Sequence, residues 1–408
     1  TMFAQGRGTR IQPLKRIKLP HSLGQFYSAV TNFLGFDMFA GDEWKVMGLA
    51  AYGKPKYYDF FAKQVLSVNG NHDFHVDINV LDHHLAKRYQ FSPAAVEALG
   101  QPRQAGEDIA EKHQDIAASA QRVLEDTVLH LLRGLHEQTG EENLCLAGGV
   151  AFNSVMNGRI MQESPFKKFF IQPAAGDAGC SLGAAYLIHH TLLKEPRGFQ
   201  MEHAYYGPGF SSEECRTALR QAELQFETLP DVELLPRVAG LIAGGAIIGW
   251  FQGRMEFGPR ALGNRSFLAD PRRGDMRELL NIKVKLREWF RPLAPSMLEE
   301  ASNHIFGHAH YDPFMITVLN VVQEQRQRIP AVVHVDGTAR PQTVSRRTNP
   351  RYWQLIHEFE KLTGVPMLLN TSFNIQEPIV CRPEDAIKTF RSASFDALVL
   401  ENNLVLRD

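Results

Sequence analysis

The stretch Leu144-Cys145-Leu146-Ala147-Gly148-Gly149-Val150-Ala151-Phe152-Asn153 decides the fold class. Its four leading apolar residues predict a short buried strand, and the glycine pair behind them predicts a tight loop. Residues 115–140, just before it, carry apolar side chains at helical spacing. The same order of elements recurs at residues 169–193, where an apolar run, a glycine loop and an apolar helix follow one another. Helices, strands and glycine loops in alternation predict an α/β fold.

A second α/β region is predicted further along the chain. The stretch 194–210 is interrupted by prolines and glycines and has no periodicity, so we place a domain boundary there and expect domains at residues 1–202 and 203–408. Apolar patterns in the second domain predict helices at 212–222, 234–242, 352–362 and 383–391, and strands at 246–251, 314–322, 331–335, 367–369 and 397–400.

Composition limits the class of protein. The chain has 408 residues, 44% of them hydrophobic, and a formal net charge of -1, which argues against a general nucleic-acid or membrane-surface role. The four cysteines lie far apart, without the spacing of a zinc site or a disulfide framework. A reducing, cytoplasmic setting is therefore expected. No apolar run is long enough to span a bilayer, and an oligomer stays possible.

Two glycine-containing loops could bind ligands in the first domain. Gly148 and Gly149 join a strand to a helix, so backbone N–H groups there can approach a phosphate or nucleotide, although a plain tight turn has the same sequence. Asp177 lies in a similar loop and could ligate a metal or cap the following helix. The residues alone favour the cap. His83-His84 lacks a partner histidine one helical turn away and is interpreted as structural.

The stretch 254–291 is the most basic part of the chain. It contains ten Lys or Arg residues and five Asp or Glu residues. Several of the cations, among them Arg260 and Arg291, lie beside Gly, Pro or aromatic residues rather than on a polar helical face. Arginine forks suit phosphate oxygens, and a lysine such as Lys285 adds a point charge. Surface salt bridges and an RNA-binding patch are the alternatives, but aromatic stacking platforms are not evident.

Two polar loops follow predicted strands of the second domain. One includes Arg340 in the stretch 334–342, and the other is Asn370-Thr371-Ser372-Phe373-Asn374. Open α/β sheets commonly bind ligands where strands end. The amide of Asn370 and the hydroxyl of Ser372 could hold a carbamoyl or phosphate group.

Six motifs in the chain resemble those of the NodU and cephalosporin carbamoyltransferase family. They occur in the family's order: DEWKVMGLAAYG (42–53), GGVAFN (148–153), GDAG (176–179), EFGPRALGNRS (256–266), RPLAPS (291–296) and NTSFN (370–374). The family consists of O-carbamoyltransferases that act on hydroxyl-bearing metabolites such as nodulation factors and antibiotics. The resemblance covers almost the whole chain.

The resemblance implies a specific fold and reaction. It implies a partial Kae1-like domain of the actin/Hsp70/sugar-kinase fold at residues 1–202 and a YrdC/Sua5-like twisted α/β domain at residues 203–408. The second domain would make carbamoyl-adenylate from carbamoyl phosphate and ATP, and the first would transfer the carbamoyl group to a hydroxyl. No membrane or nucleic-acid partner is expected.

The resemblance also assigns residues by motif. The catalytic set, expected to line the second-domain site, is Arg260, Lys285, Arg291, Arg340, Asn370 and Ser372. The nucleotide-binding set is Gly148, Gly149, Asn153, Glu43 and Lys45. Asp177 matches a ligand of the family's divalent metal, for which Fe²⁺ is expected and Mg²⁺ is possible, and this match outweighs the cap.

One departure from the family leaves alternatives open. The family carries a His-x-x-x-His metal motif in a front segment that is not found here. We therefore expect a truncated chain that keeps adenylate chemistry but transfers poorly. A tRNA threonylcarbamoylation factor and a non-catalytic nucleotide-binding remnant are the alternatives. A hydrogenase-maturation carbamoyltransferase is disfavoured because the cysteines do not suit zinc fingers.

Overall fold

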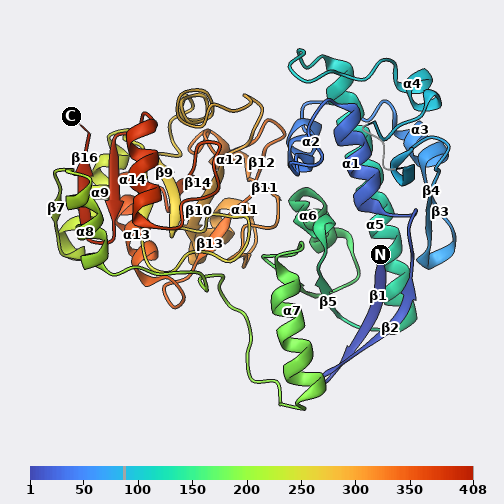
Figure 1. The fold of residues 1–408 in the computed structure, drawn as a ribbon, viewed down its shortest axis with the longest axis horizontal. Coiled ribbons are helices and arrows are strands. Elements are labelled where there is room, and N and C mark those ends of the chain that lie inside the picture. The colour runs from blue at the N-terminus through green and yellow to red at the C-terminus, as the bar shows by residue number, and fades with distance from the viewer. Residues whose placement is uncertain (86–88, 408) are drawn as a thin grey trace. The chain divides into compact units, whose positions relative to one another are not determined.

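The computed structural model describes residues 1–85 and 89–407 and divides into two compact units (Figure 1). The units are Thr1–Phe199 and Gln200–Asp408, whereas the sequence placed the boundary between residues 202 and 203. Each unit combines helices with strands, so the predicted α/β class is confirmed. Within the described residues, no helix has the length and apolar character needed to cross a membrane.

A long helix, α5 (Glu111–Thr139), lies at the centre of the first unit. Its apolar face is buried, as the spacing of apolar residues predicted. Two shorter helices, α1 (Leu23–Phe33) and α2 (Glu43–Ala50), pack against it. Helix α5 ends at Gly140, which has a left-handed backbone with φ of 65°. Glycine adopts that conformation without strain, so the sequence determines where the helix stops.

The predicted strand, glycine loop and helix around residue 148 are confirmed. Strand β5 (Asn143–Leu146) ends before the glycine pair, a short helical turn spans Gly149–Phe152, and α6 (Ser154–Glu163) follows. β5 pairs in parallel with β6 (Lys168–Ile171), after which α7 (Gly179–Leu187) begins. The glycine loop therefore lies between a strand end and a helix start.

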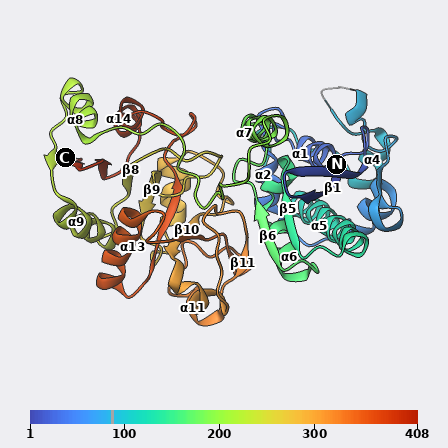
Figure 2. The same cartoon turned by 90° about the horizontal axis from the view of Figure 1, so that it is seen from below.

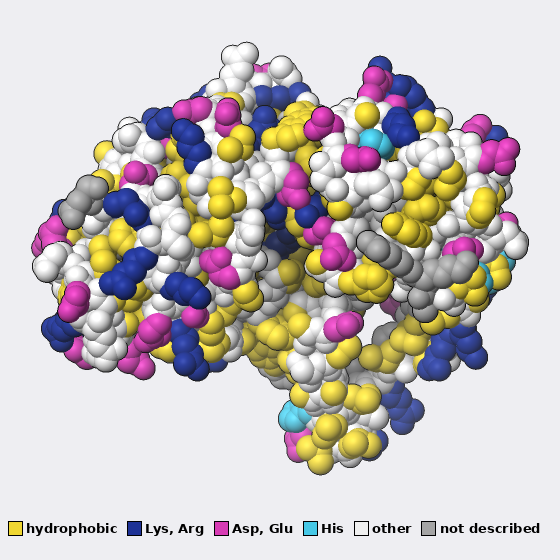
Figure 3. Space-filling view, turned by 45° about the horizontal axis from the view of Figure 1, so that its top comes forward, with side chains coloured by type: hydrophobic (Ala, Val, Ile, Leu, Met, Phe, Trp, Pro, Cys, Tyr) yellow, Lys and Arg dark blue, Asp and Glu magenta, His cyan; other side chains and the backbone are white. Residues whose placement is uncertain are grey.

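A hairpin and several short elements complete the first unit. They are β1 (Met2–Arg7), β2 (Arg10–Arg16), α3 (Tyr58–Phe60), β3 (Leu66–Val68), β4 (Phe74–Val76) and α4 (Pro93–Leu99). The short helical segment Ile188–Leu192, which follows α7, exposes apolar side chains. Figure 3 shows hydrophobic side chains among polar ones on one face of the molecule. Acidic and basic side chains are interspersed elsewhere on that face, as the near-zero net charge leads one to expect.

An eight-stranded mixed sheet forms the second unit, with strand order β13-β10-β14-β9-β8-β15-β16-β7 among the described residues. Neighbouring strands are antiparallel except for the pairs β10–β13 and β8–β15. The strands are β7 (Glu227–Thr228), β8 (Ile248–Phe251), β9 (Arg265–Ala269), β10 (Ala294–Leu298), β13 (Gln342–Val344), β14 (Met367–Ser372), β15 (Ala397–Leu400) and β16 (Asn403–Leu406).

Two pairs of helices cover this sheet. Helix α9 (Asp231–Ala243) packs with α13 (Pro350–Thr363), and α8 (Ser212–Gln221) packs with α14 (Pro383–Ser392). Figure 2 shows the two pairs on opposite sides of the strands. The sheet is therefore a buried layer, and all five residues of β9 are buried. Short elements lie outside it: α10 (Met276–Glu278), α11 (Ser302–Phe306), β11 (Leu319–Asn320), α12 (Gln323–Arg326) and β12 (Thr338–Ala339).

Two predicted strands of this unit are wrong. Within 314–322 only Leu319–Asn320 is strand, because the buried carboxylate of Asp312 accepts the backbone N–H groups that a strand would use. The stretch 331–335 is a turn whose apolar side chains are nevertheless partly buried. Both runs are apolar because they pack on the core, and periodicity does not distinguish a buried loop from a strand.

Candidate functional site: a cluster of cations

Five cationic side chains of the second unit lie close together. Burial, followed by the charge of Arg260, lowers the pKa of Arg340 well below its usual value. Arg287 and Arg291 lower it further. Burial also lowers the pKa of Lys285, again with contributions from Arg287 and Arg291. The four cations assigned from separate motifs thus form one cluster, and a fifth belongs to it.

Arg287 is the cluster member that the sequence assignment missed. Its Nε donates to Oδ1 of Asn281 at 2.7 Å, and its backbone N–H donates to the Asn281 carbonyl at 2.9 Å. Asn281, fully buried, also donates to the carbonyl of Arg291 at 3.0 Å. One asparagine therefore fixes the loop that carries both arginines. The available signal was the position of Arg287 in the basic stretch, two residues after Lys285.

Three guanidinium nitrogens of the cluster are buried without a hydrogen-bond partner among the described residues. They are Nε of Arg260, Nε of Arg340 and Nη2 of Arg287. Burial lowers the pKa of Arg260 to about 10, and burial together with the charge of Arg291 lowers the pKa of Arg287 to about 9. Burying an unpaired charge is costly, so the arrangement favours an anion that can accept these N–H groups.

Carboxylates offset this charge only in part. Asp312 raises the pKa of both Arg260 and Arg340, but its oxygens accept the backbone N–H groups of Ile316 and Thr317, each at 2.9 Å, and the Thr317 hydroxyl at 2.5 Å. Glu288 lies 3.6 Å from Arg291. Glu377 raises the pKa of Lys285. These carboxylates, all in the described part of the chain, thus offset some of the positive charge of the five cations.

The ammonium group of Lys285 joins the cluster to the end of β14. Nζ donates to the carbonyl of Ser372 at 2.6 Å, to its hydroxyl at 3.0 Å and to Oδ1 of Asn374 at 2.9 Å. These three bonds use all three donors of the ammonium group. Lys285 therefore holds the Ser372–Asn374 loop in place, in addition to contributing positive charge.

Asn370 presents a buried acceptor near the same strand end. Its Nδ2 donates to the carbonyl of Ala261 at 3.1 Å and to the hydroxyl of Ser296 at 2.7 Å. Its Oδ1 is buried and has no partner among the described residues. Because Ala261 follows Arg260 directly, Asn370 lies beside the loop of residues 252–264 that carries Arg260, called the arginine loop below. The unit thus offers unpaired donors and an unpaired acceptor.

The predicted nucleotide loop of the first unit is open, but one of its residues is already engaged. Gly148 has φ of +100°, and a Cβ at Gly148 or Gly149 would meet nothing within 4 Å. Asn153 instead caps α6 by accepting the N–H of Met156 at 3.0 Å, and its amide pairs with that of Gln121 at 2.9 and 3.0 Å. The glycines leave room for a ligand, whereas the side chain of Asn153 is engaged in hydrogen bonds to Met156 and Gln121 that hold the loop in place.

Glu43 and Lys45 lie in the first turn of α2. Glu43 accepts a hydrogen bond from the Ser28 hydroxyl at 2.5 Å. Lys45 pairs with Asp42 at 2.9 Å and lies over the ring of Trp44, 5.4 Å from its centroid. Both side chains therefore have partners within the first unit, and their predicted part in nucleotide binding stays a prediction.

The predicted metal ligand lies at the surface of the first unit. Asp177 is exposed, in a turn just before α7, whose N-cap position is Ala178. Within the described residues no three His, Cys, Asp or Glu side chains group together as a metal site would require. The residues present therefore do not by themselves fit the family's metal. His83 is buried, and its Nε2 contacts the Pro20 carbonyl at 2.7 Å.

Comparisons with known proteins cover both units. The sequence model described as "Carbamoyltransferase N-terminus" matches residues 2–186, and "Carbamoyltransferase C-terminus" matches residues 239–407. An uncharacterized protein of Synechocystis is 43% identical over 98% of this chain and 70% of its own length. Nodulation protein NolO of Bradyrhizobium diazoefficiens is 42% identical over 99% of this chain and 72% of its own length. Nodulation protein NolNO of Sinorhizobium fredii is 41% identical over 99% of this chain.

The chain spans 58% to 72% of the length of these three relatives. Both family models match in the order expected from the motifs, and the residues of the cation cluster fall in the C-terminal match. The chain belongs to the carbamoyltransferase family.

Proposed function

We propose that the second unit makes carbamoyl-adenylate from carbamoyl phosphate and ATP, and that the protein is an O-carbamoyltransferase. The observation that carries the proposal is the cluster of five cations, in which three buried guanidinium nitrogens have no hydrogen-bond partner among the residues that the structure describes. Both proposed substrates are phosphate anions, whose oxygens accept the hydrogen bonds that these guanidinium groups offer. We propose a YrdC-like fold for this unit and a Kae1-like fold for the first.

The proposed reaction uses the cluster to offset negative charge. Water releases phosphate from carbamoyl phosphate and leaves carbamate. A carbamate oxygen then bonds to the α-phosphorus of ATP, and the bond from that phosphorus to the oxygen of the departing pyrophosphate breaks. Fixed cations in a site partly shielded from water stabilise the charge that develops on the phosphate oxygens. Arg260, Arg287 and Arg340 are suited to this because their N–H groups are already in place.

Asn370 and Ser372 suit the carbamoyl end of the substrate. A carbamoyl group has an NH₂ that donates and a carbonyl oxygen that accepts hydrogen bonds. The buried Oδ1 of Asn370 needs a donor, and a carbamoyl NH₂ supplies one. The backbone and hydroxyl of Ser372 are held by Lys285 at the end of the same strand, so the two side chains can distinguish a carbamoyl phosphate from a plain phosphate.

For the first unit we propose nucleotide binding at Gly148 and Gly149 and transfer to a hydroxyl of a sugar or secondary metabolite. The open space at both glycines supports the nucleotide, as does the helix that begins behind them. Two of the relatives are named nodulation proteins, which agrees with a hydroxyl-bearing acceptor. Within the described residues Asp177 is not part of a group of three or more His, Cys, Asp or Glu side chains, and no step here depends on a metal.

The test is carbamoyl-phosphate-dependent exchange of labelled pyrophosphate into ATP by the 408-residue chain. We expect exchange that requires carbamoyl phosphate and that falls at least about 100-fold in Arg340→Met, a loss of transition-state stabilisation of about 2.7 kcal/mol. Arg277→Met, an arginine with no part in the cluster, is the matched control. Exchange that does not need carbamoyl phosphate, or that survives Arg340→Met, overturns the proposal.

Acceptor carbamoylation is measured beside the exchange reaction. We expect the chain alone to carbamoylate an acceptor poorly, since no three His, Cys, Asp or Glu side chains of the described residues group together as a metal site requires. Binding of tRNA with a steep dependence on salt concentration would instead support a tRNA-modification factor.

A further inference from the structure

Arg260 lies in a long loop whose shape depends on side chains rather than on a helix or strand. The chain leaves β8 at Phe251 and enters β9 at Arg265, and the residues between form only bends and turns. Arg260 is in the middle of this segment. Backbone hydrogen bonds of the sheet therefore do not fix its position, and something else must do so.

One buried carboxylate closes the loop. Oε1 of Glu256 accepts the backbone N–H groups of Leu262 at 2.7 Å, Asn264 at 2.8 Å and Arg265 at 3.2 Å. Glu256 is only 6% exposed. These bonds join the two ends of a segment that has Arg260 at its centre, so the carboxylate determines the path of the chain on both sides of that arginine.

The peptide groups after Arg260 are held from the opposite side as well. The carbonyl of Leu262 accepts the hydroxyl of Tyr205 at 2.9 Å and Nε2 of Gln342 at 2.8 Å. Asn370 donates to the carbonyl of Ala261. Carbonyl groups thus face donors of the surrounding unit. Three of the N–H groups donate to one atom, Oε1 of Glu256, while the N–H of Gly263 donates to the Ser266 hydroxyl at 3.0 Å.

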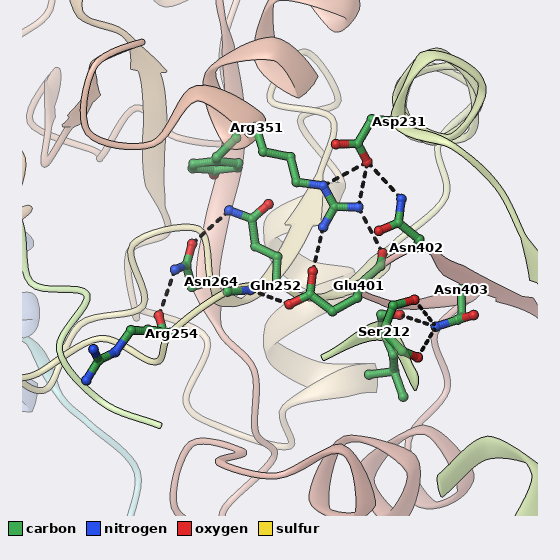
Figure 4. Close-up of polar contacts among 12 residues, drawn as sticks. Ser212, Asp231, Gln252, Arg254, Asn264, Arg351, Glu401, Asn402 and Asn403 are labelled. Carbon is green, nitrogen blue, oxygen red and sulfur yellow. Dashed lines mark hydrogen bonds and ion pairs between the residues drawn. The ribbon is translucent and has the colours of Figure 1, made fainter. Parts of the chain in front are cut away.

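A second polar layer supports the closed loop, and Figure 4 shows part of it. Oδ1 of Asn264 accepts from Gln252 at 2.9 Å and from Asn349 at 3.0 Å, and Nδ2 of Asn264 donates to the Arg254 carbonyl at 2.7 Å. At the loop entrance, Glu401 accepts the N–H of Gly253 at 2.5 Å. These bonds hold the loop ends without reaching Arg260.

We propose that Glu256 is a positioning residue for the cation cluster, because its carboxylate folds the loop that presents Arg260. The proposal rests on the function proposed above and adds to it a residue that contacts no substrate. A negative charge beside a phosphate site would ordinarily weaken binding. Three backbone N–H groups donate to this carboxylate, so its negative charge is offset by hydrogen bonds within the loop.

The test is a double-mutant cycle read by pyrophosphate affinity, measured by calorimetry at fixed salt concentration. Glu256→Ala removes the acceptor, and Glu256→Gln keeps one carbonyl oxygen of nearly the same reach. We expect Glu256→Ala to weaken pyrophosphate binding about tenfold and Glu256→Gln to restore most of it. Glu233→Gln, an exposed glutamate of α9, is the matched control and should bind as the parent chain does.

The cycle is closed in an Arg260→Met background. If Glu256 acts through Arg260, the tenfold effect of Glu256→Ala disappears there, because residues in one network are not additive. An effect of the same size in both backgrounds shows a general structural role and overturns the inference, as does unchanged affinity in Glu256→Ala. If Arg260→Met itself leaves pyrophosphate affinity unchanged, the proposed function fails, and this inference fails with it.

Glu256→Ala also weakens the fold, so stability is measured separately. Urea unfolding of each variant reports the free energy of unfolding, and affinities are compared only at urea concentrations where every variant is folded. Should Glu256→Ala not fold, Glu256→Asp replaces it in both backgrounds. Its carboxylate reaches about one carbon–carbon bond less far, so it predicts the same non-additive loss of affinity.

Discussion

Lys285 and Ser372 are 87 residues apart, yet the ammonium group of the lysine donates to both the carbonyl and the hydroxyl of the serine. Lys285 is 2% exposed, and Ser372 is the last residue of a central strand. The pair joins the basic stretch to the polar loop that the sequence identified separately. Its consequence is that the loop and the cation cluster cannot move independently.

Lys285→Met tests this connection. The methionine has nearly the same length but no donor, so the Ser372 carbonyl and the Asn374 amide oxygen lose their bonds to the ammonium group. Each keeps one weaker, uncharged donor: the N–H of Asn374 at 3.0 Å for the carbonyl and the Ser372 hydroxyl at 2.7 Å for the amide oxygen. The loss of about 1–3 kcal/mol expected for such acceptors predicts hydrogen exchange about 10- to 100-fold faster in residues 372–377. Hydrogen–deuterium exchange with mass spectrometry measures it. Lys283→Met, an exposed neighbour, is the control, and unchanged protection in Lys285→Met would contradict the connection.

Arg340→Met separates binding from folding. In the free protein, Arg340 is partly buried among like charges, and its buried Nε has no partner in the described part of the chain. Replacing it with an apolar side chain should leave the free energy of unfolding unchanged or raise it by up to about 2 kcal/mol. The rise in Tm that pyrophosphate produces should be lost, because that rise follows binding to the folded state. Thermal unfolding with and without pyrophosphate measures both.

A structural role for Arg340 makes the opposite prediction. It would lower Tm in the absence of ligand and leave the shift caused by pyrophosphate intact. Arg277→Met, outside the cluster, should change neither quantity.

The sequence identified most members of the cation cluster but not the shape of the chain around them. Arg260, Lys285, Arg291 and Arg340 were assigned from motifs, and the structure brings them together. β9 and β10 were not predicted, although both are central in the sheet. Their sequences carry Arg265 and Pro295, residues that argue against a buried strand.

Tertiary contacts explain why strand β9 and the cluster member Arg287 were not predicted. Arg265 is tolerated in β9 because its guanidinium donates to backbone carbonyls, including those of Gln252 and Asn264, and stacks 3.5 Å from the ring centroid of Phe251. Arg287 was overlooked for a related reason. Its place in the cluster depends on the bond to Asn281 and on a left-handed Leu286 with φ of 46°, and local sequence patterns report neither.

The pH dependence of anion binding should report Arg287. Its pKa is lowered to about 9 in the folded protein by burial and by the charge of Arg291. Pyrophosphate needs the charged form, so its affinity should fall as pH rises through about 9, and that step should be missing in Arg287→Met. Calorimetric Kd values between about pH 7 and pH 10 measure it. An identical step in parent and variant would assign the titration to another group.

The free energy of unfolding should change with pH in the opposite direction to the affinity for pyrophosphate. The folded protein binds the Arg287 proton more weakly than the unfolded chain does, so the unfolded state holds more protons above about pH 9. This single group therefore makes the free energy of unfolding rise with pH in that range. Urea unfolding of Arg287→Met beside the parent chain isolates its contribution, which should be absent from the variant.

The arginine loop leaves no room for a side chain at Gly263. Its φ is +97°, and a Cβ there would lie 2.1 Å from the ring of Tyr352, a fully buried side chain. Gly263→Ala should therefore lower the free energy of unfolding by at least about 2 kcal/mol, from backbone strain and from displacement of the ring. It should also weaken pyrophosphate binding, because Arg260 is three residues away.

Gly240 supplies the matched control for that substitution. It lies in the interior of α9 with nothing within 4 Å of an added Cβ, so Gly240→Ala should raise the free energy of unfolding by up to about 1 kcal/mol. Urea unfolding monitored by circular dichroism compares the two variants directly. Equal effects of the two alanines on the free energy of unfolding would mean that the left-handed backbone and the contact with Tyr352 do not constrain the loop. The loop would then not hold Arg260 in a fixed position before the anion binds.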